Sequence, residues 1–193
     1  MTEKDEAVTR EEMHHRRIEM RGYRRSDGLF EIEGSVVDRK PHEFRAPNGD
    51  RLVPAGGAVH DISVRLIIDA DMVIRDVSTS MAAVPYPDCH GAGQVLDGLK
   101  GMRIGSGWMS EVRRRLGGPQ GCTHMMELLG PMATAAYQSL VAVRMTRPEV
   151  VNAQGRPVKV DSCYAYASHR QLVRRRWPEH YTGAETKGGK ASE

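Results

Sequence analysis

The chain of 193 residues is poor in aromatic residues and contains no long hydrophobic stretch. Phe, Trp and Tyr together make up 5% of it, so it offers little stacking surface for nucleic-acid bases. No apolar run approaches the roughly 20 residues that a membrane-spanning helix needs, and the charged first residues do not resemble a signal peptide. We therefore expect a cytoplasmic protein that binds neither nucleic acid nor membrane.

Cysteine is also scarce. The three cysteines, Cys89, Cys122 and Cys163, are odd in number and far apart, which argues against a disulfide framework and for free thiols. The 28 basic residues nearly balance the 25 acidic ones, and this balance indicates no polyanionic partner. Glycine-rich phosphate loops of the dinucleotide-binding and P-loop types are missing, so no nucleotide cofactor is implied.

Composition divides the chain into three parts. Residues 1–20 are densely charged and have little apolar periodicity, and residues 182–193 have the composition of a frayed tail. We expect a flexible arm over 1–20, one folded domain over 21–181 and a disordered tail over 182–193.

The first half of this domain has the two-residue period of β-strands. Apolar and polar residues alternate over 30–36, and again over 62–68, where a turn at 69–71 and a returning apolar segment predict a hairpin. The three prolines and three glycines within residues 41–58 predict a loop between these strands, in which a short edge strand around Leu52 is an alternative.

The second half has helical periodicity. We expect helices over 89–102, from a cap at Ser106 to Leu116, over 123–144 with a kink at Pro131, and over 165–177. Strands followed by helices predict an α+β fold, in which a small antiparallel sheet packs against the C-terminal helices.

Candidate chemistry gathers at the predicted ends of these elements. His60 and Asp61 open the central strand, Cys89 lies at a loop-to-helix junction, and Cys122 and His124 flank the start of the long helix. A sheet packed on helices can bring such ends together, and a cysteine at a helix N-terminus is biased towards the thiolate. The alternative is that the cysteines are small buried hydrophobic residues and the histidines hydrogen-bonded core groups.

A second set of candidates lies in the basic segment that opens the domain. Tyr23, Arg24 and Lys40 are suited to hold an anion or a phenolic ring, although an edge strand that is charged against aggregation has the same composition. The arginine triplets at 113–115 and 174–176 fit solvated helix faces.

Long ordered blocks of the sequence resemble a bacterial family. RGYRRSDGLFEIEGSVVDRK, PAGGAVHDISVRLIID, LGGPQGCTHMMELLGPMATAAYQ and RRRWP are similar to the family called domain of unknown function 2889. This resemblance implies an association with the degradation of aromatic compounds, and with a cofactor-independent lyase that removes formaldehyde from lignin-derived phenolic dimers. The segment from His60 to Cys122 also resembles, more distantly, NifU/SufE-type iron–sulfur scaffold domains, with His60 and Asp61 in place of the first thiol and its Asp.

Three hypotheses follow. In the first, a carbon–carbon lyase without cofactor uses His60, oriented by Asp61, or else His124, as its base. Its aromatic substrate would contact Tyr23, Arg24, Lys40, Cys89 and Cys122. In the second, His60, Cys89 and Cys122 hold zinc or iron, or an iron–sulfur cluster. In the third, the same pocket binds a small molecule without catalysis. Exposed apolar edges of a small sheet lead us to expect a homodimer.

Overall fold

A computed structural model describes residues 8–183 of the chain. The described residues group into two compact units, one up to residue 144 and one from residue 145 on, whereas the sequence led us to expect one folded domain over 21–181. The expected tail over 182–193 falls almost entirely outside the described residues, and each unit is described here by itself.

The first unit is built on a four-stranded antiparallel sheet with the order β1-β2-β5-β6. Its strands are β1 (His15–Arg24), β2 (Phe30–Arg39), β5 (Ala58–Ile68) and β6 (Ile74–Ala83). A small hairpin of β3 (Phe44–Arg45) and β4 (Leu52–Val53) is inserted between β2 and β5, where the sequence predicted a loop. The predicted strands and the hairpin of β5 and β6 are confirmed.

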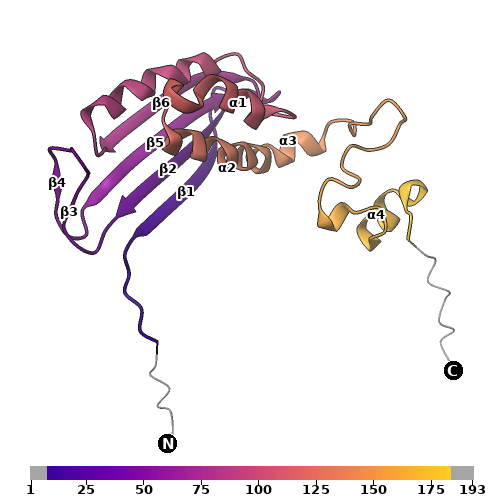
Figure 1. Cartoon of the computed structure of the whole chain (residues 1–193). Coiled ribbons are helices and arrows are strands. Elements are labelled where there is room, and N and C mark those ends of the chain that lie inside the picture. The colour runs from indigo at the N-terminus through magenta and orange to yellow at the C-terminus, as the bar shows by residue number, and fades with distance from the viewer. Residues whose placement is uncertain (1–7, 184–193) are drawn as a thin grey trace, which may run out of the picture. The chain divides into compact units, whose positions relative to one another are not determined.

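Helical segments cover one face of this sheet (Figure 1). They are the 3-10 helix η1 (Pro87–Leu99), α1 (Trp108–Leu116), the short η2 (Gly118–Gln120) and α2 (Thr123–Ser139), and the short α3 (Val141–Met145) follows α2 in the chain. Between sheet and helices lies one apolar core, to which β2 and β5 contribute alternate residues such as Ile32, Ile62 and Leu66, all at most 1% exposed. The expected α+β fold is therefore present.

Three predicted boundaries were wrong. Residues 15–20, expected in a flexible arm, form the first part of β1, which pairs with β2 along its whole length. The cap of α1 is Gly107, in a left-handed conformation, and not Ser106. The long helix passes through Pro131 and ends at Ser139, with Leu140 as its C-cap, ahead of the predicted residue 144.

The second unit is small and has its own core of Val160, Val173 and Trp177. Its helical segments are η3 (Tyr164–Tyr166), α4 (Gln171–Arg176) and η4 (Pro178–His180), so the predicted helix over 165–177 is largely replaced by shorter turns. The indole of Trp177 donates a hydrogen bond of 2.8 Å to Glu149. In neither unit is any described helix long and apolar enough to cross a membrane.

Candidate functional site

Among residues 8–183, the one buried charged side chain belongs to Asp38, which is 1% exposed. Strand alternation places Asp38 on the same face of β2 as Ile32 and Val36, towards the helices. Because Asp38 is the last but one residue of β2, its carboxylate lies at the edge of the apolar core. A buried carboxylate requires partners, and four basic side chains supply them.

The strongest partner is Arg16 on the neighbouring strand. Its guanidinium donates two hydrogen bonds to Asp38, from Nε to Oδ1 at 2.7 Å and from Nη2 to Oδ2 at 2.8 Å, and a third to Glu127 on α2 at 2.7 Å. His14 Nε2 lies 3.1 Å from Oδ1. Burial opposes ionisation of Asp38, but Arg16 and the nearby histidines outweigh it and hold the pKa of this carboxyl below its usual range.

Two imidazoles share the other carboxylate oxygen. His60, the register partner of Asp38 on β5, has its Nδ1 3.0 Å from Oδ2, and His124 Nε2 lies 3.7 Å from the same atom. The two rings are tilted by 34° to each other, with centroids 3.9 Å apart. Since an ionised carboxylate only accepts, His60 Nδ1 is the protonated nitrogen and Nε2 carries the free electron pair.

The environment also sets the charge of His60. Burial and the adjacent His124 lower its pKa below the ordinary value, against the opposing effect of Asp38. His60 is therefore a neutral imidazole at neutral pH, oriented by a carboxylate and 17% exposed. This is the arrangement of a general base.

Cys122 lies beside this pair, at the N-cap of α2. Its sulfur is 3.9 Å from His124 Nδ1. Burial raises the pKa of the thiol, but hydrogen bonding to His124 and to the backbone N–H groups of Met125 and His124 outweighs burial and lowers the pKa overall. The helix N-terminus thus favours the thiolate, as the sequence predicted.

A cavity of about 710 Å³ opens next to these groups. His60, Cys89, Cys122 and His124 all line it, so the predicted convergence of these element ends is present. Much of the remaining wall is apolar, from Ile62, Val84, Pro85, Ala92, Val95 and Pro119. Such a cavity has the size and lining of a site for a small, largely apolar molecule.

Asp61, expected to orient His60, does not belong to this cluster. Successive residues of a strand point to opposite faces, so Asp61 points away from the helix-covered face to which His60 points. The orienting carboxylate comes instead from Asp38, one strand away.

The expected substrate contacts Tyr23, Arg24 and Lys40 also lie outside the cavity. Tyr23 and Arg24 pair with the beginning of β2, seven and eight residues from Arg16, which corresponds to about 23–26 Å along a strand. Lys40 lies over the ring of Phe44, 5.1 Å from its centroid. The cation that the site does contain, Arg16, was not singled out.

A metal ion would have a different ligand set from the one expected. Ligand atoms of Asp38, His60 and His124 lie within 4.8 Å of one another, and the described residues offer no other such group of three. The predicted set of His60, Cys89 and Cys122 is not among them. Both Asp38 oxygens already accept hydrogen bonds from Arg16, which neutralises the charge that a cation would need.

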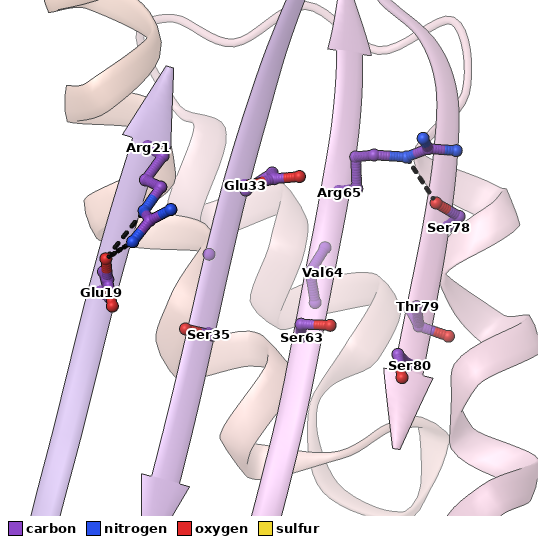
Figure 2. A pocket seen from close by; sticks show the side chains of 11 residues that line it. Glu19, Arg21, Glu33, Ser35, Ser63, Val64, Arg65, Ser78, Thr79 and Ser80 are labelled. Carbon is purple, nitrogen blue, oxygen red and sulfur yellow. Dashed lines mark hydrogen bonds and ion pairs between the residues drawn. The ribbon is translucent and has the colours of Figure 1, made fainter. Parts of the chain in front are cut away.

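A second hollow, of about 410 Å³, lies on the uncovered face of the sheet (Figure 2). Serines and oppositely charged side chains line it: Glu19 accepts hydrogen bonds from Arg21, and Arg65 donates one to Ser78. No buried titratable group contributes to this hollow, so we place the candidate site at the Asp38 cluster.

Asp38, Arg16 and His14 were missed as site residues. The alternation that marks Ile32 and Val36 as buried extends to residue 38, and a carboxylate on an apolar face was a signal for Asp38. For Arg16 and His14 the local sequence carries no comparable signal, because both precede or begin a strand with few apolar residues.

Comparison with known proteins identifies the family and gives no activity. The family model described as protein of unknown function (DUF2889) matches residues 14–138, which include the sheet, α1, the cavity wall and almost all of α2. No curated protein and no solved structure matches the chain, so the expected likeness to NifU/SufE-type domains receives no support. The chain belongs to the DUF2889 family.

Proposed function

We propose that this protein is a carbon–carbon lyase that needs no cofactor and releases formaldehyde from a lignin-derived phenolic substrate. The observation that carries the proposal is a neutral His60 imidazole, oriented by a buried carboxylate, on the wall of a mostly apolar cavity. The resemblance of the sequence blocks to a family associated with aromatic degradation supports the choice of substrate. Three free cysteines fit a reducing compartment, and we place the activity in the cytoplasm.

The cavity suits an aromatic ligand by its lining and volume. Its apolar side chains can cover ring faces, while the polar groups gather at the end formed by His60 and the start of α2. The partial positive charge of a helix N-terminus favours an anionic oxygen nearby. A phenolate with its oxygen near the start of α2 would therefore be stabilised there.

In the proposed step, His60 Nε2 removes the proton of a hydroxymethyl group on the substrate. The carbon–oxygen bond of that group becomes a double bond, the adjacent carbon–carbon bond breaks, and formaldehyde leaves. The substrate enters this step as a quinone methide, which forms when the phenol loses its proton and the benzylic carbon loses its oxygen substituent as water or as a phenol. The electron pair of the broken bond forms an alkene at the benzylic carbon, and the ring becomes an aromatic phenolate. His60 then returns its proton to the phenolate oxygen, so protons and electrons balance.

Asp38 and Arg16 support this step without contacting the substrate. Asp38 fixes the tautomer of His60 and stabilises the imidazolium that forms during the reaction. Arg16 keeps Asp38 ionised and fixes its plane through two hydrogen bonds. His124, the alternative base, has both ring nitrogens directed to Asp38 and Cys122, so it is less available to a substrate.

A metal-handling role is the second candidate, because Asp38, His60 and His124 lie within ligand distance of one another. Metal analysis of the purified protein separates the two. Stoichiometric zinc or iron, together with activity that disappears on chelation, would favour the second candidate over the lyase.

The lyase is tested with phenolic dimers that carry a hydroxymethyl group next to the benzylic carbon. Formaldehyde and the alkene product are measured with chelator-treated protein. His60→Gln is expected to lower kcat/KM by about 10²–10⁴-fold, the usual contribution of a general base. His42→Gln is the matched control, because His42 is exposed and does not line the cavity.

Two outcomes would contradict the proposal, and a third would invalidate the assay. Formaldehyde release from none of the dimers would remove the lyase, and full activity of His60→Gln would remove His60 as the base. An equal loss in His42→Gln would show that the assay does not report on the cavity.

A further inference from the structure

We propose that Cys122 is a nucleophile that binds formaldehyde covalently, and that His124 is its proton carrier. The inference deepens the proposed function and rests on it for the identity of the aldehyde. It assigns a chemical role to a thiol that the lyase step does not use.

The geometry around Cys122 is that of an activated thiol. Its sulfur lies 3.9 Å from His124 Nδ1, and His124 Nε2 lies 3.7 Å from the buried carboxylate of Asp38. The ring is close enough to receive the thiol proton, and the carboxylate lies beyond its other nitrogen as a counter-charge. The position at the N-cap of α2 adds the partial positive charge of a helix N-terminus, which favours a thiolate.

The exposure of Cys122 and its position indicate that its ligand would come from the same cavity. Cys122 is partly exposed and lines the cavity wall together with His60. Because the ring of His124 lies 3.9 Å from that of His60 and 3.9 Å from the Cys122 sulfur, a product released at His60 forms close to the thiol. Cys163 provides an internal comparison, since it is exposed and belongs to the other unit.

The chemistry balances without a further reagent. The Cys122 proton passes to His124, and the sulfur electron pair forms a bond to the carbonyl carbon of formaldehyde. The carbon–oxygen π electrons move to oxygen, which takes the proton from His124. The product is an S-hydroxymethyl cysteine, and reversal of the same steps releases the aldehyde. A reactive product would thereby be held until it leaves.

The first test compares the alkylation rates of the three cysteines by iodoacetamide near neutral pH, followed by peptide mass spectrometry. Cys122 is expected to react about ten-fold faster than Cys163 although it is less exposed, because the thiolate is the reacting form. His124→Gln should remove this advantage, and His42→Gln should leave it intact. A Cys122 rate at or below that of Cys163, or no effect of His124→Gln, would overturn the inference.

The second test adds formaldehyde alone. It is expected to slow alkylation of Cys122 and leave Cys163 unaffected, and ¹³C-labelled formaldehyde should give an S-hydroxymethyl carbon signal that Cys122→Ala lacks. His42→Gln, at an exposed residue that does not line the cavity, should behave like the parent protein in both measurements. Protection of Cys122 without any lyase turnover would leave this inference standing and remove the proposed function. Turnover without protection would do the reverse.

Discussion

The two faces of the sheet carry similar charged groups in opposite surroundings. On the uncovered face, Glu19 and Arg21 form an ion pair that is largely in contact with water (Figure 2). On the helix-covered face, Asp38 and Arg16 form a pair of similar length, but the carboxylate is 1% exposed. The first pair loses little hydration and gains little from pairing. The second pair exists only because every lone pair of the carboxylate has a donor within reach.

The contrast explains why the candidate reactive groups lie on the covered face of the sheet. A charge that water already stabilises has little effect on nearby side chains, whereas a buried charge acts strongly on the groups around it. On the covered face the Asp38 carboxylate acts in this way on the rings of His60 and His124. The comparison can be tested from its strongest contrast to its weakest.

The largest effect is expected from Asp38→Asn. The substitution removes the counter-charge of Arg16 and of the surrounding histidines, and breaking such a buried pair costs about 3–5 kcal/mol of unfolding free energy. Urea denaturation measures the change. Asp61→Asn, one strand away on the opposite face, is the matched control, and an equal loss in both variants would contradict the asymmetry.

Crowding on the two faces should also differ. A Cβ added to Gly34 would lie 2.8 Å from both Cγ and Sδ of the buried Met132, because α2 packs directly over this strand. Gly34→Ala is therefore expected to cost about 1–3 kcal/mol by overpacking. Ser35→Ala, the next residue on the open face, should leave the denaturation midpoint unchanged. A tolerated Gly34→Ala would show that α2 can move away from the sheet.

The pH dependence of stability is expected to be a smaller effect that is specific to the covered face. His60 is faced by Asp38 from β2, by His124 from α2, and by His14 and Arg16 from the β1 segment. Its pKa in the folded protein is below the ordinary 6.5, so the unfolded chain binds the proton more readily. The contribution of the neutral His60 ring to the free energy of unfolding is complete above pH 6.5. It is lost as the pH falls through the lower pKa that His60 has in the folded protein.

Denaturation near pH 7.5 and near pH 5.5 measures this loss by its difference between the parent protein and His60→Gln. The parent should lose more stability on acidification than the variant does. Parallel curves would mean that burial does not hold His60 in its neutral form.

The smallest effect is expected on the open face. Glu19→Gln removes the partner of Arg21, but both side chains are well exposed and the pair is screened by water and salt. The denaturation midpoint should stay within experimental error, and added salt should not change that result. A clear loss of stability would show that the uncovered face is covered in solution, as the expected homodimer would require.

Much of the fold was predictable because alternation is a local signal. Strands β2, β5 and β6 alternate apolar and polar residues and were found from the sequence, whereas the beginning of β1 was missed. Met20 and Gly22 face α2 from that edge strand, but the charged residues between them hide the pattern. The end of α2 at Ser139 was missed for a related reason, because the apolar period continues into α3.

The site was only partly predictable because its central contact is not local. His60, Cys89, Cys122 and His124 could be placed at element ends, and the cavity does join them. The pairing of Asp38 with His60 depends on the register of β2 against β5, which no residue pattern in either strand specifies by itself. The neighbouring Asp61 was therefore chosen in its place.

Two imidazole rings beside one carboxylate oxygen make the two proposed reactions depend on each other. Two positively charged rings whose centroids lie 3.9 Å apart would repel each other strongly. A proton that His60 gains from a substrate therefore disfavours the transfer of a second proton from the Cys122 thiol to the neighbouring ring. Base catalysis at His60 and thiol addition at Cys122 would then take place one after the other and not at the same time.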